Sequence, residues 1–429
     1  MRGTRPVCQT TSRIRNFTTL CRILSRHSVV NVVTKGVSME KNALVVGLGI
    51  AGMASAIGLR KAGWNVTIIE RSDRRRTGGY FVGLFPEGID AAARLGVLDA
   101  IGIDARSVRD SRTWEVDAAG RRHRSAGFLD DPKRPVGVLR SDIEASLWET
   151  VDNTIDDIRF GVIPAAISFG PAGQAVTLRD TSTGGEREEE FDLIVGADGL
   201  RSTVRAHAFA DHETCIQQWK SMICAFELDD QVPGYADRDA LVFAEPGRAF
   251  WVFPYEDHNP TGLFIFRTDD IDTQLRIGRD AALEGAFGDV SVPEVQYGLA
   301  QARTTEFSLF DSTGIVDIPE WRRSRTILMG DAAWCLTLYS GMGATSAMLG
   351  GAVLGEWVAR ESDLDRALTG WEQEMRAFIR RQRLIARIKY EIFVPSNRFR
   401  AVLRSGMLRA AGRTVAPIAA RNRVRNALS

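Results

Sequence analysis

Apolar positions after residue 42 form two short strands that are separated by a glycine-rich turn and one helix. Residues 43–46 are continuously apolar, and an alanine-rich stretch extends from the turn to Ala62. Gly63 ends the predicted helix, because glycine readily adopts the left-handed conformation that follows many helices. A second, mostly apolar strand over residues 65–69 ends at Glu70. This order predicts a β-α-β unit of about 30 residues.

The next part of the chain alternates between helical and strand-like patterns. A helix is expected over residues 141–151, and strands are expected over residues 175–179 and 192–195. The segment 181–190 between these strands is rich in threonine, glycine and glutamate, which predicts an exposed hairpin turn.

From about residue 215 to residue 310, apolar and polar positions alternate and aromatic side chains are frequent. The clearest strands cover residues 241–243, 250–253 and 262–266, and this period of two predicts a mostly antiparallel sheet. After a further apolar strand at 326–329, a helix is expected over 344–360, and helical patterns continue to the C-terminus. The fold class is therefore α/β: a Rossmann-like domain, an interleaved β-sheet domain and C-terminal helices.

The composition is that of an ordinary folded protein, with 44% hydrophobic and 25% charged residues in a chain of 429. A formal charge of +1 gives no reason to expect nucleic acid as a partner. No apolar run reaches about 18 residues, so no transmembrane segment is expected. Five cysteines without a C-x-x-C pair favour a reducing compartment. These features predict a soluble, cytoplasmic protein.

No metal site and no hydrolase motif is expected. His207 and His212 are the most closely spaced histidines, and they do not share one face of a helix. The sequence also lacks a P-loop, a G-x-S-x-G segment and an H-E-x-x-H segment.

Residues 1–38 contain several arginines and many serines and threonines, but no acidic residue. This composition is typical of an organelle transit peptide. The alternative, which we favour, is that these residues form a disordered extension or precede the true start at Met39. Both hypotheses predict a basic leader that is not part of the mature fold.

The glycine-rich turn has the residues that a dinucleotide site requires. Gly47 permits a tight turn, Gly49 lets the backbone approach a pyrophosphate, and Gly52 lets the helix pack closely on the strand. Ile50 and Ala51 begin the helix, whose N-terminus favours the phosphate charge. Glu70 ends the second strand, where a carboxylate binds a ribose hydroxyl.

Two later segments identify the nucleotide. Asp192-Leu-Ile-Val-Gly-Ala-Asp-Gly-Leu-Arg-Ser-Thr-Val-Arg205 and Ile327-Leu-Met-Gly-Asp-Ala-Ala333 resemble the DG and GD motifs of the single-component aromatic hydroxylases. These are FAD-dependent monooxygenases with the p-hydroxybenzoate hydroxylase fold. The resemblance implies that Asp331 binds the ribityl chain of FAD, and that Asp198 lies near both FAD and the nicotinamide. Each aspartate alone is also compatible with a capped turn between a strand and a helix.

The resemblance covers roughly residues 42–380 and extends to single side chains. It places Arg71 near the adenosine and Arg140 near the flavin or its ribityl chain. It also implies that backbone N–H groups at the start of the helix expected over 344–360 approach the flavin ring, at Gly341, Gly343 and Ala344. The chain is most similar to the antibiotic-tailoring and tetracycline-inactivating members of the family.

The implied domains are a basic leader (1–38), an FAD-binding domain (39–210 and 321–375), a substrate-binding β-sheet domain (211–320) and a basic helical tail (376–429). The implied cofactor is non-covalent FAD, with NADPH or NADH as a transient co-substrate. The implied reaction uses molecular oxygen, through a C4a-peroxyflavin, to oxygenate an aromatic or polycyclic small molecule.

One segment departs from the family pattern. Where members commonly have histidine and two prolines after Gly-Asp-Ala-Ala, this chain has residues 334–338, Trp-Cys-Leu-Thr-Leu. An FAD-dependent oxidase, dehydrogenase or reductase without oxygen transfer therefore stays open. The basic C-terminal tail leaves a second alternative open, a flavin-binding accessory protein of a biosynthetic complex. Trp334 is a candidate for shaping the pocket, and an ordinary core tryptophan is the alternative.

Aromatic residues on successive predicted strands imply a wall of the substrate pocket. Because side chains alternate between the two faces of a strand, only about half of them share one cavity. Trp251 and Tyr255 are further pocket candidates within this set, whose other members are Phe243, Phe250, Phe253, Phe264 and Phe266.

The C-terminal tail carries many arginines and, after Glu374, the single acidic residue Glu391. A basic helix of this kind could contact an anionic membrane surface or an acidic partner protein. The alternative, which we favour, is a solvated helix that packs on the catalytic body through Leu384, Ile385, Ile388 and Phe393.

Overall fold

The computed structural model describes residues 20–25, 28–33, 41–75, 79–103, 112–130, 135–170, 173–255, 258–306 and 308–426. The chain divides into two units, residues 1–41 and residues 42–429. In the first unit, β1 (Leu20–Ser25) pairs antiparallel with β2 (Ser28–Val33). Met39, the start residue that we favour, lies outside the described residues.

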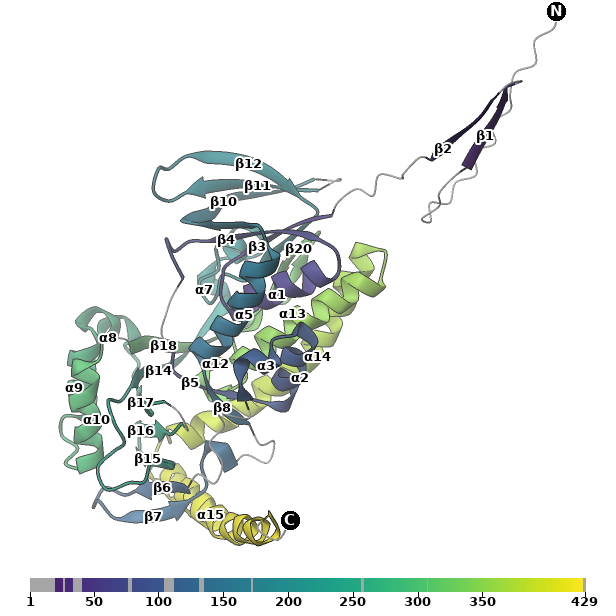
Figure 1. The fold of residues 1–429 in the computed structure, drawn as a ribbon. Coiled ribbons are helices and arrows are strands. Elements are labelled where there is room, and N and C mark those ends of the chain that lie inside the picture. Colours follow the sequence, from purple (N-terminus) through teal and green to yellow (C-terminus); the bar gives the residue numbers. More distant parts are fainter. Residues whose placement is uncertain are drawn as a thin grey trace, which may run out of the picture. The chain divides into compact units, whose positions relative to one another are not determined.

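The predicted β-α-β unit lies in the middle of a six-stranded sheet (Figure 1). The strand order is β19 (Arg322–Arg323), β20 (Thr326–Leu328), β13 (Leu193–Gly196), β3 (Asn42–Val46), β4 (Asn65–Glu70) and β9 (Asp157–Phe160). All neighbours are parallel except β19 and β20. The apolar runs of β3 and β13 are buried, as expected for parallel strands that are covered on both faces.

Two helices of the second unit, residues 42–429, cross with almost no space between their backbones. α1 (Ile50–Lys61) follows the glycine-rich turn, and α13 (Gly343–Arg360) belongs to the C-terminal part of the chain. A Cβ atom on Gly58 would lie 2.4 Å from the carbonyl oxygen of Gly351, and one on Gly355 would lie 2.5 Å from that of Gly58. These glycines therefore set the distance between the two helices.

Gly355→Ala is expected to lower the free energy of unfolding by about 1–3 kcal/mol, because the added methyl group must push the two helices apart. Urea unfolding of the purified variant measures this loss. Gly285→Ala is the matched control, since a Cβ at this position of another helix meets no atom within 4 Å. Equal stability of the two variants would show that the crossing tolerates the extra volume.

A second sheet has seven strands and contains the predicted antiparallel region. Its order is β18 (Ser308–Val316), β14 (Ile216–Glu227), β17 (Thr261–Arg267), β16 (Arg248–Phe253), β15 (Asp239–Glu245), β6 (Arg112–Val116) and β7 (Arg122–Ser125). Neighbours are antiparallel except β15 and β6. β6 and β7 thus join this sheet from residues 112–125, which lie within the segment 39–210 that was predicted to belong to the FAD-binding domain. Their short strands carry no signal of which sheet they join.

The aromatic residues of this sheet alternate between its two faces, as predicted. Phe243, Phe250, Phe264 and Phe266 lie in a core with Phe287 on α9. Trp251, Phe253 and Tyr255 lie in a different buried cluster, on the other side. Figure 1 shows α8 (Ile271–Ile277), α9 (Arg279–Phe287) and α10 (Pro293–Thr304) together along one side of this sheet.

The remaining elements connect the two sheets or cover the first one. A two-stranded ladder is formed by β5 (Phe81–Leu84) and β8 (Val136–Leu139), and a three-stranded sheet by β10 (Val162–Phe169), β11 (Gln174–Asp180) and β12 (Glu186–Phe191). The predicted turn over 181–190 is too long, because residues from Glu186 onward form β12, and the strand predicted at 192–195 belongs to the six-stranded sheet as β13. The helices are α2 (Pro86–Leu95), α3 (Leu98–Ile101), η1 (Phe128–Asp130), α5 (Arg140–Thr154), α6 (Thr203–Ala208), α7 (His212–Cys215), α11 (Asp331–Trp334) and α12 (Thr337–Ser340).

Two long helices end the chain, α14 (Leu364–Phe393) and α15 (Arg398–Asn426). Phe393 is buried, as predicted for a packing residue. Leu384 and Ile388 are 66% and 61% exposed, so their predicted packing role is wrong. α14 uses a different face, which includes Trp371, Met375 and Ile379.

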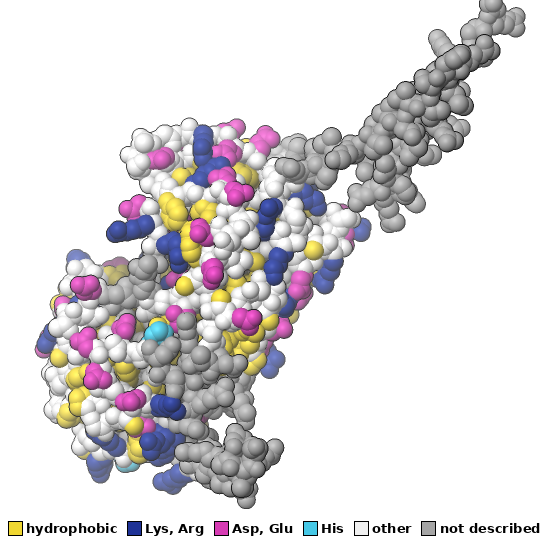
Figure 2. All heavy atoms as spheres, in the orientation of Figure 1, with side chains coloured by type: hydrophobic (Ala, Val, Ile, Leu, Met, Phe, Trp, Pro, Cys, Tyr) yellow, Lys and Arg dark blue, Asp and Glu magenta, His cyan; other side chains and the backbone are white. Residues whose placement is uncertain are grey.

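Charges of both signs are interspersed over the face of the molecule in Figure 2, which agrees with the net charge of +1. Among the helices of the described residues, none has the length and apolarity needed to cross a membrane.

Candidate FAD and substrate site

The turn between β3 and α1 brings the backbone to the edge of a cavity. Gly47 adopts a φ of +103°, and its N–H donates to the carbonyl oxygen of Ile69 at 2.8 Å. Gly52 packs on this turn, because a Cβ there would lie 1.9 Å from the Gly47 oxygen. Gly49 is the N-cap of α1 and has open space where a Cβ would be. Since no side chain caps this 12-residue helix, its first N–H groups are suited to an anion.

Glu70 is held at the end of β4 by two backbone groups. Its Oε2 accepts from the Leu48 N–H and its Oε1 from the Ser72 N–H, both at 2.9 Å. The carboxylate therefore ties the glycine-rich turn to the end of the second strand. Glu70 also lines the cavity, where it remains able to accept a further hydrogen bond from a ribose hydroxyl.

This first cavity, of about 190 Å³, is lined by several arginines in addition to the turn. Arg140 is paired with Glu144 at 2.7 Å, and Arg201 lies 3.4 Å from Asp311. The cavity combines a helix N-terminus with positive side chains, so it favours a polyphosphate group. The arginines are Arg71, Arg74, Arg75, Arg140 and Arg201.

A second cavity of about 370 Å³ continues from the first. Both cavities are lined by Gly49, Arg140, Ala197 and Gly199, so these residues mark the junction. One elongated ligand can therefore occupy both cavities, with a charged middle at the junction.

Asp331 begins α11, and its side chain is open to the second cavity. Surrounding protein raises the pKa of this carboxyl group above its ordinary value, and the positive charge of Arg140 opposes that rise. A carboxyl group in this position suits a ligand with hydroxyl groups. These groups donate hydrogen bonds to the carboxyl oxygens and bring no further charge into the cavity.

Asp198 lines the first cavity, but its carboxylate is used at the start of α6. It accepts from the N–H groups of Thr203 and Val204 and from the hydroxyl groups of Ser202 and Thr203. The capping role that the sequence left open is therefore present. The predicted proximity to FAD and nicotinamide stays a proposal.

Arg205 was not among the predicted site residues, although it ends the DG segment. It is fully buried and donates to the carbonyl oxygens of Leu200 at 2.6 Å and Ala332 at 2.8 Å. This side chain therefore joins the DG loop to the GD helix. The sequence signal was its position as the last residue of the DG segment.

The start of α13 faces the same cavity. Gly341 has a φ of +69°, and Gly341, Gly343 and Ala344 all line the second cavity. α13 has 18 residues and no side-chain cap, so its N-terminal N–H groups and its dipole favour negative charge here.

The rest of the second cavity is mainly apolar. Its wall on the seven-stranded sheet uses inward-facing residues of β14, β16, β17 and β18, and it is closed by residues of η1 and α14. The apolar residues of this wall are Ile223, Ala225, Phe253, Leu263, Leu309, Phe128 and Phe393.

The three predicted pocket candidates are not among the residues that line either cavity. Trp334 is fully buried, with its ring 4.7 Å from that of Trp321 and its Nε1 donating to Ser346. Trp251 lies beside the wall, in the same buried cluster as Phe253, and its Nε1 donates to the carbonyl oxygen of Phe393 at 3.1 Å. Tyr255 is buried in the same cluster. These residues pack around the cavity without lining it, whereas Tyr80 and Thr261, which were not predicted from the sequence, reach it.

The two cavities fit FAD in their order and chemistry. The predicted cofactor residues line them, except Gly52, which packs inside the turn. Glu70 and the arginines would hold the adenosine and pyrophosphate, and Asp331 and α13 would hold the ribityl chain and the ring system. Within the described part of the chain, no cluster of histidine, cysteine and acidic side chains is suited to a metal ion.

Residues 40–372 match the family described as "FAD binding domain", and the chain belongs to this family. It is an FAD-dependent oxidoreductase of the monooxygenase class. A relative named flavin-dependent monooxygenase from Legionella longbeachae serogroup 1 (strain NSW150) is 27% identical over 354 residues, which cover 80% of this chain and 87% of that protein.

Two solved structures have a similar fold. Tetracycline destructase Tet(51) superposes with a TM-score of 0.70 at 22% identity, covering 88% of this chain and 98% of that one. HpxO from Klebsiella pneumoniae, solved with FAD and uric acid, also gives 0.70 at 20% identity, covering 88% and 96%. The predicted fold and the predicted FAD cofactor are confirmed.

Asp331→Ala is expected to weaken FAD binding by about 1–3 kcal/mol, or roughly 5- to 150-fold in Kd, because a ribityl hydroxyl loses its acceptor in a site surrounded by protein. Titration of the flavin-free protein with FAD measures the change. Asp331→Asn keeps one acceptor oxygen and should lose less. Full retention of FAD by the alanine variant would refute the role of Asp331.

Proposed function

We propose that the protein transfers one oxygen atom from O₂ to an aromatic or polycyclic small molecule that is largely apolar, with NADPH or NADH as the reductant, and that it does so in the cytoplasm. The observation that carries the proposal is the continuity of the second cavity. It runs from Asp331 and the start of α13 to the apolar wall of the seven-stranded sheet. A substrate on this wall would therefore lie against the ring end of the cofactor.

Bound FAD would accept hydride from the reduced nicotinamide and, with O₂, supply the oxygen atom that is transferred. The chain contributes positioning and electrostatics. The N–H groups and dipole of α13 favour negative charge at the ring end, which stabilises a reduced, anionic ring system. Phe253, Leu263 and Leu309 exclude water from the opposite side.

The polar groups of the wall indicate an uncharged substrate. Burial raises the pKa of Tyr80 above its ordinary value, so its phenol stays protonated near neutral pH. Thr261 and Thr313 add hydroxyl groups, and among the described lining residues of the second cavity there is no histidine. These neutral groups suit a hydroxyl or carbonyl oxygen on a flat apolar framework. A free carboxylate would find Arg140, which is paired with Glu144, and would also meet Asp311, an acidic residue that lines the same cavity.

The nicotinamide would bind only transiently. The sequence has one glycine-rich fingerprint, at residues 47–52, and we assign it to FAD. A second nucleotide would therefore use the surface near the cavity mouth rather than a dinucleotide fold of its own.

NADPH and NADH oxidation by the purified holoenzyme tests the substrate class. A panel of neutral phenols and fused-ring phenols is compared with the carboxylates of the same ring systems. We expect neutral compounds to raise the oxidation rate about tenfold or more over the substrate-free rate, and the matched carboxylates to have little effect, because a charge is poorly solvated in this cavity. Preference for the carboxylates would refute the proposed class, while leaving FAD binding unaffected.

A further inference from the structure

The face of α15 that points away from the body of the molecule is apolar. Phe399 and Val402 are 75% and 74% exposed, and Leu403 and Met407 are 49% and 52% exposed. Their spacing of three, four and eight residues from Phe399 places them on one side of the helix. We call these four side chains the apolar stripe.

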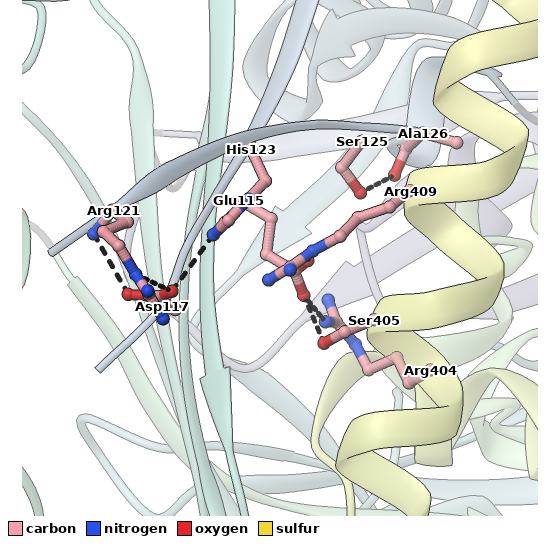
Figure 3. Close-up of polar contacts among 9 residues, drawn as sticks. All are labelled: Glu115, Asp117, Arg121, His123, Ser125, Ala126, Arg404, Ser405 and Arg409. Atoms are coloured by element: carbon pink, nitrogen blue, oxygen red, sulfur yellow. Dashed lines mark hydrogen bonds and ion pairs between the residues drawn. The ribbon is translucent and has the colours of Figure 1, made fainter. Parts of the chain in front are cut away.

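The opposite side of α15 is the one that docks on the protein. Arg404 is 2% exposed and forms an ion pair with Glu115 of β6 at 2.7 Å. The carbonyl oxygen of Leu408 accepts from the N–H of Ala126, and a Cβ on Gly412 would lie 2.5 Å from the backbone of Ser125. Figure 3 shows Arg404, Ser405 and Arg409 of the helix directed at Glu115. The orientation of α15 is therefore fixed, and it turns the apolar stripe outward.

Arginines lie on both sides of the apolar stripe. Arg398, Arg400 and Arg413 are exposed on the same helix. After Glu391, every charged side chain in the sequence is an arginine, and further ones follow at positions 421, 423 and 425. A helix with an apolar face and arginine flanks matches the pattern of helices that lie in the interface of a membrane.

From these observations we infer that α15 is a docking surface for an anionic lipid membrane, on which the apolar stripe inserts between the lipid headgroups. A second copy of the chain is disfavoured, because it would bring two rows of arginines together. A stable protein interface also buries about 1,000 Å² or more, which is a large area for a stripe of four side chains. Membrane binding needs less buried area, because electrostatic attraction adds about 1 kcal/mol for each arginine near the anionic surface. Partial insertion of the stripe and this attraction together suffice for reversible binding.

Flotation of the full-length holoenzyme with vesicles tests the proposal. One set of vesicles contains phosphatidylcholine alone, and the other contains about one third phosphatidylserine, which supplies the negative surface potential. We expect binding to the anionic vesicles only, and weaker binding at high salt. Equal binding to both sets, or to neither, would overturn the proposal.

Two variant pairs locate the contact. Phe399→Ser with Leu403→Ser should lower the vesicle-bound to free ratio about tenfold or more, because apolar burial is lost. Leu275→Ser with Ile277→Ser is the matched control, since both residues are exposed apolar side chains on α8. Arg398→Gln with Arg413→Gln should weaken binding, whereas Arg121→Gln with Arg366→Gln removes the same charge from other exposed sites and should not. Equal effects of variant and control would overturn the assignment to α15.

Sedimentation of the same proteins tests whether a second copy of the chain, instead of a membrane, covers the apolar stripe. We expect Phe399→Ser with Leu403→Ser to leave the oligomeric state and FAD content unchanged. A wild-type oligomer that dissociates in this variant would assign the apolar stripe to a second copy of the chain and would overturn the membrane proposal.

Discussion

Replacing Gly49 by alanine is expected to weaken FAD binding by about 3–4 kcal/mol, or two to three orders of magnitude, while leaving the folded, flavin-free protein almost unchanged. No atom lies within 4 Å of the position of a Cβ here, so the apoprotein accommodates the methyl group. The same position borders both cavities, where a pyrophosphate must approach the backbone N–H groups of α1. The methyl group would prevent that approach and cost more than one charge-assisted hydrogen bond.

FAD titration and urea unfolding of the flavin-free protein separate the two effects. Gly52→Ala provides the contrast, since its Cβ would lie 1.9 Å from the Gly47 oxygen and must disturb the fold itself. Gly285→Ala, on the open face of a distant helix, should change neither quantity by much. If Gly49→Ala bound FAD normally, the nucleotide would have to lie elsewhere.

Glu115→Ala is expected to lower the free energy of unfolding by about 3–5 kcal/mol, because it leaves a buried guanidinium without its carboxylate. Glu115 and Arg404 are each 2% exposed and lie 2.7 Å apart, and Ser405 and Arg409 bind the same carboxylate (Figure 3). Urea unfolding measures the loss. Glu115→Ala with Arg404→Met should recover much of it, since neither charge then remains buried. Full stability of the single variant would show that α15 contributes little to the fold.

The contribution of Glu115 to the free energy of unfolding should decrease as the pH falls. Burial alone would raise the pKa of Glu115, but Arg404, Ser405 and Arg409 together lower it below the ordinary value. The ionised carboxylate therefore stabilises the fold fully above the pKa of an unfolded glutamate. This contribution is lost as the pH falls through the lower pKa of the folded state, and Glu115→Gln should remove that part of the acid dependence.

The β-α-β unit and the antiparallel sheet followed from local patterns in the sequence. The turn at Gly47, the helix to Lys61 and the strand that ends at Glu70 are formed by neighbouring residues, so the sequence signal was strong. The GD segment indicated FAD through its resemblance to a family motif, which could be recognised because its residues form one contiguous strand and helix start. For the same reason, the alternation of Phe250 and Phe253 between two clusters was predictable.

Features that depend on distant contacts were not predictable in this way. β6 pairs with β15, which begins more than 100 residues later, at Asp239. Trp334 packs against Trp321 and Trp371, which no local pattern indicates. Leu384 and Ile388 are exposed because a different face of α14 packs against the core, and contacts with distant parts of the chain determine which face that is. The outward apolar stripe of α15 depends likewise on the ion pair between Arg404 and Glu115.

Oxygen transfer would take place in the second cavity, next to the altered segment after Ala333. Residues 335–338 of that segment line the cavity itself. The decisive measurement is the mass of the product that the holoenzyme forms from NADPH, ¹⁸O₂ and a neutral phenolic substrate that stimulates NADPH oxidation. We expect a product that carries one ¹⁸O atom from the gas. A product without the label would contradict oxygen transfer and would identify the protein as an oxidase, dehydrogenase or reductase instead.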